Sequence, residues 1–263
     1  MAMPMKPSLP RDRDRGHDEG VRTLGLIGGM SWYSTLEYYR IINTEVQRRR
    51  GGHASASVAL QSLDFETVRR CQLAEDWVAA GRLLGDAARR CEAGGAEVVL
   101  ICTNLMHKVA DAVAASVSVP LLHIADAVAA EAERHGWTRL GLLGARWVME
   151  ETFYADRLAA HGISVVVPDA ADRAMVDRVI FAELTQGRVE STSRAAYAAV
   201  VDDLAARGAE AVVLACTEIG LLLTPADSPL PLIDSMQAHA LAAVDFALAP
   251  ATELWDPALA LTR

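Results

Sequence analysis

The sequence resembles itself, and this internal repeat constrains the fold more than any other feature. Three segments of the first half recur in the same order in the second half, at offsets of 116, 113 and 111 residues. The paired segments are LGLIG (24–28) with LGLLG (140–144), GAEVVLICTN (95–104) with GAEAVVLACT (208–217), and VPLL (119–122) with LPLI (230–233). Gly-Ala-Glu before a valine-rich strand is common in α/β proteins, so a chance match of the second pair stays open. The shared order of all three pairs favours two half-chains of one ancestral unit, related by an approximate two-fold axis.

Short apolar segments alternate with segments of helical periodicity from about residue 21 to about residue 250. This alternation predicts an α/β fold with parallel sheets and right-handed crossovers, in which ligands bind beyond the carboxyl ends of the strands. We expect strands near 21–28, 55–65, 97–102, 120–124, 139–143, 164–168, 210–215 and 230–234. We expect helices near 31–49, up to 93, from 104, from 126, up to 161, from 171 to 207 with breaks, and near 236–248.

The helix expected after the first strand gives the most specific local predictions. Ser31 follows Gly28-Gly29 and is expected to cap the helix. Apolar residues at helical spacing predict its buried face, namely Leu36, Tyr39, Ile42 and Val46. Gly28-Gly29-Met30-Ser31 could also cradle an anion at the helix start, and a plain tight turn is the alternative.

The register of the second repeat identifies two candidate reactive positions. Counted from the glycine that begins each segment, Cys216 lies eight residues on, and the residue eight on from Gly95 is Thr103. Neighbouring strand residues point to opposite faces, so Thr103 and Cys216 are expected to face each other while Cys102 points elsewhere. Each position ends a strand where a helix begins. A helix N-terminus is expected to lower the pKa of the Cys216 thiol, and its N–H groups bind carboxylates.

Charge and composition exclude several functional classes. The chain has 25 Lys and Arg against 34 Asp and Glu, a net charge of −9, so a nucleic-acid partner is not expected. Its apolar runs are too short to span a bilayer. Residues 1–20 are charged, lack the apolar core of a secretory signal, and are expected to form a disordered tail. Four cysteines without a Cys-x-x-Cys pair favour a reducing cytoplasm over a disulfide framework.

The other cysteines and the histidines could have a structural or a functional role. Cys102, Cys71 and Cys91 are expected to be buried apolar residues. His107 lies one helical turn beyond Thr103 and either supports the site or has a structural role. The histidines show no metal-ligand spacing, so no metal site is expected, and no lysine has a context that indicates pyridoxal phosphate.

Four segments resemble the aspartate/glutamate racemase family of cofactor-independent amino-acid racemases, over about residues 22–248. They are GLIGGMSWYSTLEYYRIIN, RRRGGHASASVALQSLDF, CTNLMHKVAD and ACTEIG. The resemblance implies two pseudo-symmetric α/β domains, parallel sheets flanked by helices, and an active site in the interdomain cleft. We assign residues 21–126 plus about 231–250 to the first domain, 127–230 to the second, and 251–263 to a tail. The resemblance further implies a cytoplasmic homodimer that acts on a small-molecule amino acid without cofactor or metal.

The family mechanism implied by this resemblance uses two opposed cysteines. One removes the α-proton as a thiolate, and the other returns a proton to the opposite face. Here threonine replaces the first cysteine, at Thr103, whereas the second motif is intact as Cys216-Thr217-Glu218. A branch with the same Thr/Cys pair is associated with L-aspartate and L-glutamate.

The resemblance also assigns supporting roles. It implies substrate contacts by six residues, which are Met30, Ser31, Gln61, Asn104, Leu105 and Thr217, and supporting roles for His107 and Glu218. Four family positions carry apolar residues instead, namely Ala54, Leu105, Ala145 and Val148. These replacements remove polar groups that could contact a substrate and weaken the case for an acidic side chain.

Threonine and cysteine differ in their suitability as bases. A general base works best with a pKa near the working pH, which a thiol at about 8.5 approaches and an alcohol does not. We therefore expect Cys216 to abstract the α-proton of the L-enantiomer and the Thr103 side to return a proton. Alternatives are another cysteine-dependent enzyme of the superfamily, such as hydantoin racemase, maleate isomerase or arylmalonate decarboxylase, and a non-catalytic amino-acid-binding module.

Overall fold

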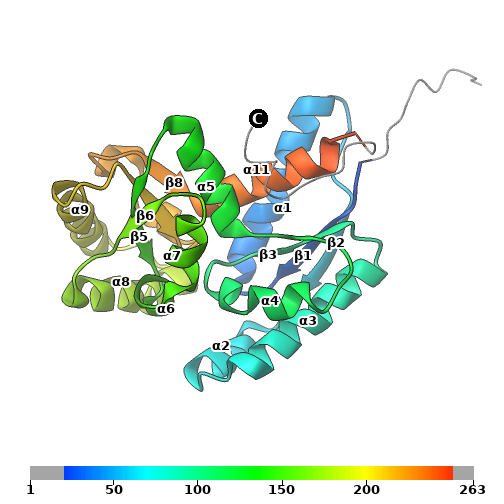
Figure 1. Ribbon diagram of the computed structural model, residues 1–263, viewed down its shortest axis with the longest axis horizontal. Coiled ribbons are helices and arrows are strands. Elements are labelled where there is room, and N and C mark those ends of the chain that lie inside the picture. Colours follow the sequence, from blue (N-terminus) through cyan, green and yellow to red (C-terminus); the bar gives the residue numbers. More distant parts are fainter. Residues whose placement is uncertain (1–20, 251–263) are drawn as a thin grey trace, which may run out of the picture.

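The computed structural model describes residues 21–250 as two α/β lobes side by side (Figure 1). Each lobe has a four-stranded parallel sheet, ordered β2-β1-β3-β4 in the first and β6-β5-β7-β8 in the second. The expected α/β class and the two-domain architecture are confirmed. The tails expected at 1–20 and 251–263 lie outside the described residues.

The first half of the chain supplies one sheet and its covering helices. Its strands are β1 (Leu24–Gly28), β2 (Val58–Ser62), β3 (Val98–Ile101) and β4 (Leu121–Leu122). Its helices are α1 (Trp32–Arg50), α2 (Phe65–Leu73), α3 (Trp77–Ala93), the 3₁₀ turn η1 (Leu105–Val109) and α4 (Ala110–Ala114).

The second half repeats this plan and adds a returning helix. Its strands are β5 (Arg139–Gly144), β6 (Ser164–Val166), β7 (Ala211–Ala215) and β8 (Leu232–Asp234). Its helices are α5 (Ile124–His135), α6 (Arg146–Glu150), α7 (Thr152–Ala159), α8 (Ala170–Ala182), η2 (Leu184–Gln186), α9 (Ser191–Ala206), α10 (Ile219–Leu222), η3 (Pro225–Asp227) and α11 (Ser235–Leu248).

The sheet registers reproduce the sequence repeat residue by residue. Leu24 of β1 pairs with Val98 of β3, and Leu140 of β5 pairs with Ala211 of β7. The repeat aligns the same residues, Leu24 with Leu140 and Val98 with Ala211. The register that makes Thr103 the counterpart of Cys216 is therefore the register of the folded chain.

The sheets are buried on both faces, as expected for parallel strands. In β1, Leu24 and Leu26 join the core formed with α1 and α11, whereas Ile27 joins the core on the α3 side. A Cβ at Gly25 would lie 2.9 Å from the Cβ of Cys91, so glycine is needed for α3 to pack this closely on β1. This close packing fixes the strand ends that carry the site.

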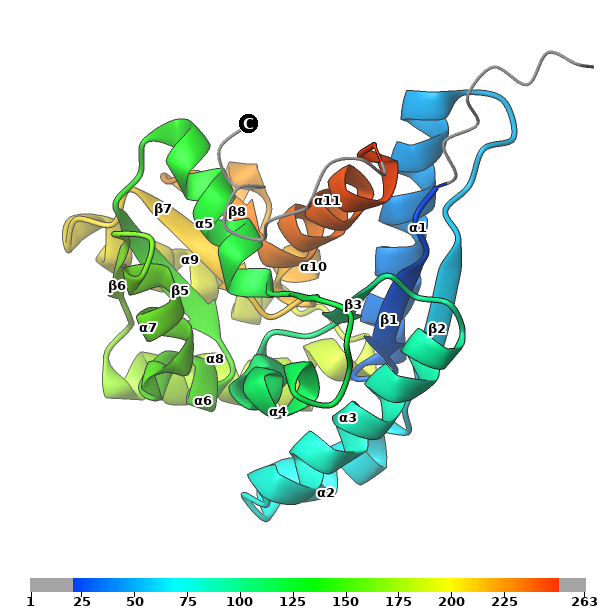
Figure 2. The ribbon, with the colours of Figure 1, turned by 45° about the vertical axis from the view of Figure 1, so that its right-hand side comes forward.

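One part of the domain division differs from the sequence expectation. Residues from about 231 were assigned to the first domain, but β8 pairs with β7 in the second sheet. The reason is the repeat itself, because β8 is the counterpart of β4 at the edge of the sheet. The chain then returns through α11, which lies beside α1 (Figure 2) and shares the core of Tyr38 and Ile42.

Two local predictions for the helices are wrong. Helix α1 buries Tyr38, Ile42 and Val46, whereas Leu36 and Tyr39 are 56% and 49% exposed, so the buried stripe runs along a neighbouring row of the helix. The helix expected up to Ala93 is two helices. It breaks after Leu73, where Glu75 has a φ of 52° and the Asp76 carboxylate caps α3 by accepting the Ala79 N–H.

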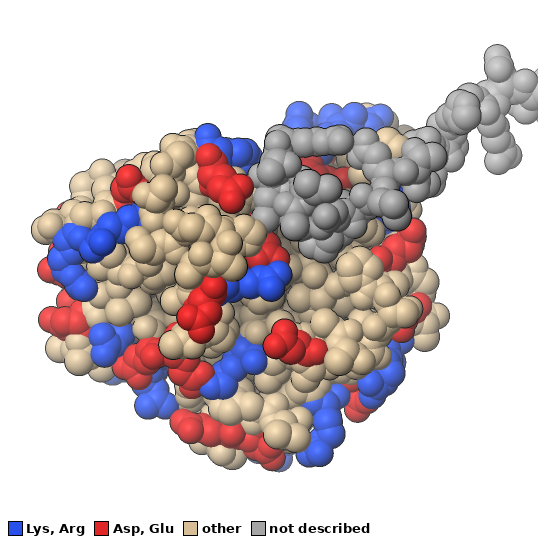
Figure 3. Space-filling view, viewed as in Figure 1, with Lys and Arg blue, Asp and Glu red and all other residues tan. Residues whose placement is uncertain are grey.

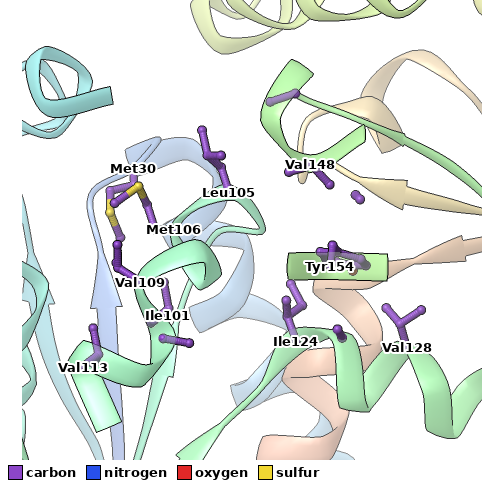
Figure 4. Close-up of a cluster of buried hydrophobic side chains, with 14 of the residues drawn as sticks. Met30, Ile101, Leu105, Met106, Val109, Val113, Ile124, Val128, Val148 and Tyr154 are labelled. Carbon is purple, nitrogen blue, oxygen red and sulfur yellow. The ribbon is translucent and has the colours of Figure 1, made fainter. Parts of the chain in front are cut away.

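The largest hydrophobic cluster is continuous between the lobes. It joins Met30, Ile101 and Leu105 of the first half to Val148 and Tyr154 of the second (Figure 4). The lobes are thus packed together around the ends of their sheets. On the face shown in Figure 3, acidic and basic side chains are interspersed. No helix within residues 21–250 is long and apolar enough to cross a membrane.

Candidate active site

A small pocket lies between the two lobes and contains both reactive positions. Its volume is about 30 Å³, which leaves room for little more than one water molecule. The lining residues are Met30, Phe65, Gln72, Thr103, Asn104, Leu105, Ala145, Ile180, Phe181, Thr185, Ala215, Cys216 and Glu218. The structure therefore brings Thr103, from the end of β3, and Cys216, from the end of β7, to one pocket.

The thiol of Cys216 is hydrogen-bonded to a carboxylate. Its Sγ donates a hydrogen bond to Glu218 Oε2 at 3.3 Å. The residue keeps partial exposure, but burial of the thiol and the nearby Glu218 charge raise the pKa of Cys216 well above its ordinary value. The lowered pKa expected from a helix start is therefore wrong. Helix α10 has only four residues, so its dipole is weak, and burial of the thiol, followed by the Glu218 charge, outweighs it.

The Glu218 carboxylate is buried and fully hydrogen-bonded. The residue is 4% exposed. Its Oε1 accepts from Ser31 Oγ at 2.5 Å and Ser34 Oγ at 2.6 Å, and its Oε2 accepts from Thr217 Oγ1 at 2.7 Å as well as from Cys216. Ser31 and Ser34 belong to the first turn of α1, where the helix dipole stabilises a negative charge. These hydrogen bonds therefore fix the carboxylate in place beside the thiol.

This network corrects the expectation for Ser31. It lies at the N-cap position of α1 but makes no side-chain cap, because its hydroxyl donates to Glu218 of the other lobe. Thr217 also lies outside the pocket and lines a neighbouring groove of about 510 Å³. Both residues act through Glu218, and neither lines the small pocket with Cys216.

Thr103 is held by its backbone. Its carbonyl oxygen accepts a hydrogen bond from His107 Nδ1 at 2.8 Å, because His107 Nε2 accepts the N–H of Ile124 at 3.1 Å. His107 contacts His123 edge-to-face and is buried, and this burial lowers its pKa well below the ordinary value, so the ring is neutral. His107 thus fixes the position of Thr103 while leaving the threonine hydroxyl to the pocket.

Asn104 joins the lobes through its side-chain amide. Its Oδ1 accepts from Tyr154 Oη at 3.1 Å, and its Nδ2 donates to Ser235 Oγ at 3.0 Å. Ser235 in turn donates to the carbonyl of Leu214 in β7. Asn104 is 2% exposed, so in this closed arrangement its amide positions the ends of β3 and β7 relative to each other.

The structure does not bring Gln61 to the pocket. Its Oε1 accepts from Arg90 Nε at 2.7 Å, and the residue lies on β2 outside the lining. Gln72 of α2 lines the pocket instead, 3% exposed, with its Nε2 donating to Met106 Sδ at 3.2 Å. No motif in the sequence indicates Gln72, because it lies inside an ordinary helix.

The remaining lining residues include two of the predicted substrate contacts and several residues that were not predicted. Met30 and Leu105 line the pocket as expected. Sequence reasoning missed the lining roles of Phe65, Ile180, Phe181 and Thr185, which come from α2, α8 and η2. From the sequence, Ala145 was named only as a position that differs from the family motif. In the repeat it is the equivalent of Gly29, since each directly follows the corresponding strand.

Comparisons with known proteins agree on one family. The family model described as Asp/Glu/Hydantoin racemase matches residues 27–243. A solved structure named "putative Asp/Glu Racemase from Yersinia pestis" is 47% identical, with a TM-score of 0.82, and the match covers 87% of this chain and 100% of that chain. An aspartate racemase homologue from Pyrococcus horikoshii is 30% identical, with a TM-score of 0.73 over 86% of this chain and 99% of that chain.

A curated relative adds a broader activity. The broad specificity amino-acid racemase RacX of Bacillus subtilis is 25% identical over 150 residues. The match covers 57% of this chain and 64% of the relative's length.

Proposed function

Because this chain belongs to the Asp/Glu/hydantoin racemase family, we propose that it racemises a free amino acid without pyridoxal phosphate. Cys216 removes the α-proton on one side, and the Thr103 side returns a proton to the other. One observation carries the proposal. The two equivalent positions of the repeat line a single pocket, and a hydrogen-bonded carboxylate contacts the thiol there.

Glu218 gives the thiol a route to its reactive form. The Cys216 proton passes to Glu218 Oε2, which already accepts its hydrogen bond, and leaves a thiolate. The thiolate takes the α-proton, so the thiol is restored and a carbanion forms at Cα. The substrate ammonium stabilises the Cys216 thiolate and the carbanion, since an opposite charge stabilises an ionised form.

Reprotonation uses a poorer acid on the opposite side. The Thr103 hydroxyl gives its proton to the carbanion and recovers one from a water molecule, and the hydroxide that remains takes the proton held by Glu218, so that the carboxylate, the thiol and the hydroxyl are all restored. An alcohol is a weak base, so turnover that starts from the Thr103 side is expected to have the smaller kcat. Enantiomers have equal free energy, so the ratio of kcat/KM in the two directions stays at one, and the asymmetry appears in kcat and KM separately.

The resemblance names aspartate and glutamate as substrates, and they belong in the first assay. Exchange of the α-proton for deuterium is followed by NMR in D₂O for the wild type and Cys216→Ala. Exchange that disappears in the variant supports the proposal, and chiral analysis of the same sample shows inversion. Exchange that survives Cys216→Ala would contradict the role given to the thiol.

A binding module is the second candidate, because one catalytic cysteine of the family pattern is absent. In that case amino acids would protect Cys216 from alkylation without any exchange. A hydantoin racemase or maleate isomerase would turn over its own substrate and leave free amino acids unchanged. Measuring exchange, protection from alkylation and turnover of these other substrates therefore distinguishes an amino-acid racemase, a binding module and another enzyme of the superfamily.

We also propose that the chain forms a homodimer through the outer face of α1. Trp32, Leu36 and Tyr39 are 57%, 56% and 49% exposed and follow one another at helical spacing. Glu37 and Arg40 form an ion pair on the same helix, so the face carries both signs of charge. A two-fold contact places the same surface on both partners and needs such self-complementarity. The occupant proposed for this face is a second copy of the chain.

A further inference from the structure

The pocket walls beside Cys216 are largely apolar. Seven lining side chains are apolar and surround the reactive positions, namely Met30, Phe65, Leu105, Ala145, Ile180, Phe181 and Ala215. The polar lining groups other than Cys216 and Glu218 are uncharged, and they are Gln72, Thr103, Asn104 and Thr185. Among residues 21–250, no lysine or arginine lines the pocket. Its one charged lining residue is Glu218, an anion.

One cation, Arg69, packs against the wall of the pocket. The Arg69 guanidinium lies 3.6 Å from the centre of the Phe181 ring, and its Nη1 donates to Gln72 Oε1 at 3.1 Å. Arg69 belongs to α2 and contacts two lining residues without lining the pocket itself. Its charge is therefore committed to the wall of the pocket.

Substrate candidates differ only in the side chain. Every amino acid brings one ammonium and one α-carboxylate, whereas aspartate and glutamate bring a second carboxylate. That carboxylate would lie against apolar walls and beside the Glu218 side chain, with no lysine or arginine among the described lining residues to pair with. Burial of an unpaired charge is strongly unfavourable, and like charges add to the penalty.

A cationic side chain meets a different obstacle. Glu218 is the only lining carboxylate among the described residues, and it already accepts hydrogen bonds from four side chains. It offers no free lone pair of good geometry to a substrate ammonium or guanidinium at the far end of a side chain. The walls therefore match a side chain without charge.

We infer that this site selects amino acids with uncharged side chains over aspartate and glutamate. The inference rests on the proposed racemase function and assigns the substrate class of the same pocket.

Isosteric substrate pairs give the sharpest test. Asparagine and aspartate have the same shape, as do glutamine and glutamate, and each pair differs in one charge. With the wild-type chain in D₂O, kcat/KM for α-proton exchange is expected to be about 10-fold or more higher for the amide of at least one pair. Equal rates within both pairs, or faster exchange of aspartate or glutamate, would overturn the inference.

A variant supplies the missing cation. Thr185 lines the pocket, and its hydroxyl donates only to the carbonyl of Phe181 at 3.3 Å. Thr185→Lys is expected to raise exchange of aspartate or glutamate relative to the amides, and Thr185→Met, a long side chain without charge, is the matched control. Arg69→Met is expected to leave the amide-to-acid ratio unchanged. If this variant selectively abolished exchange of the acids, Arg69 would be their receptor and the inference would be wrong.

Failure of the proposed function has a different signature. Absence of exchange for a wide amino-acid panel, or exchange retained in Cys216→Ala, would contradict the racemase mechanism itself. A preference for the acidic member of each pair, lost in Cys216→Ala, would keep the mechanism and overturn only the substrate class. The comparison of wild-type substrates does not depend on any variant folding.

Discussion

Cys216 and Glu218, two residues apart after β7, are joined by a hydrogen bond of 3.3 Å from the thiol to the carboxylate. The carboxylate is also held by two serines of α1, so the state of the thiol depends on contacts with the other lobe. The thiol at rest is therefore protonated, with its proton acceptor already in place.

Glu218→Gln keeps the shape of this pair and removes its charge. We expect kcat to fall by about 10²–10⁴, the usual contribution of a positioned acid or base. The pKa of Cys216 is expected to fall at the same time, because the Glu218 charge raises it. Alkylation of Cys216 by iodoacetamide, followed against pH, then shifts to lower pH while activity drops.

The control for this variant is Glu75→Gln, which removes an exposed carboxylate far from the thiol in sequence. A fall in kcat together with alkylation of Cys216 at lower pH would identify Glu218 as the proton acceptor. Unchanged kcat in Glu218→Gln would contradict that role.

Thr103 separates proton exchange from inversion. Thr103→Val removes the hydroxyl at nearly constant volume, so Cys216 still exchanges the α-proton of the L-enantiomer. Formation of the D-enantiomer is expected to fall by about 10²-fold or more, because the opposite face lacks a donor. Thr103→Ser keeps the hydroxyl and should retain inversion. NMR and chiral chromatography on one sample measure both rates, and wild-type inversion by Thr103→Val would refute the relay.

Three buried histidines predict sensitivity to acid. Burial lowers the pKa of His123 to about 3 and that of His239 to about 4, and the pKa of His107 also lies well below its ordinary value. The unfolded chain binds these protons below about pH 6.5, whereas the folded chain does not. Their contribution to stability is complete above about pH 6.5 and is lost as the pH falls toward 4.

Urea unfolding at pH 7, 6 and 5 measures this effect. Each histidine is expected to lower the free energy of unfolding by about 1.4 kcal/mol per pH unit in this window. His123→Gln should flatten the slope by one such contribution, and the exposed His135→Gln should not. A slope identical in the wild type and His123→Gln would contradict the assignment.

The α1 face predicts a dimer that one charge disrupts. Leu36→Glu places a carboxylate in the centre of the exposed apolar face, where a two-fold contact would bring two such charges together. Sedimentation equilibrium is expected to show a dimer for the wild type and a monomer for the variant. Val78→Glu, at a 69% exposed site on α3, is the control. A monomeric wild type would remove the proposed interface.

The repeat was sufficient to predict much of this architecture. It placed the strands that correspond in the two sheets and identified Thr103 as the counterpart of Cys216, because strand pairing and strand order follow from local pattern. It could not indicate Phe65, Gln72 or Phe181, which reach the pocket from helices. Helix residues come together at a site through packing, and packing leaves no motif in the sequence.

The errors at the site have physical causes of the same kind. The pKa of Cys216 was expected to be low because a helix follows it, but burial of the thiol raises it and the Glu218 carboxylate adds to the effect. The face of α1 was misassigned because apolar residues lie on two adjacent rows of the helix, and only Tyr38, Ile42 and Val46 meet α11 and β1. The sequence alone does not show that Gln72 rather than Gln61 lines the pocket, because this depends on the path of α2.

The most direct test of the account is exchange of the α-proton in D₂O by the wild type and Cys216→Ala, with asparagine, aspartate, glutamine and glutamate as separate substrates. The account predicts exchange by the wild type, faster for an amide than for its acid, and no exchange by Cys216→Ala. Exchange that persists without the Cys216 thiol would contradict the central claim that this residue is the base.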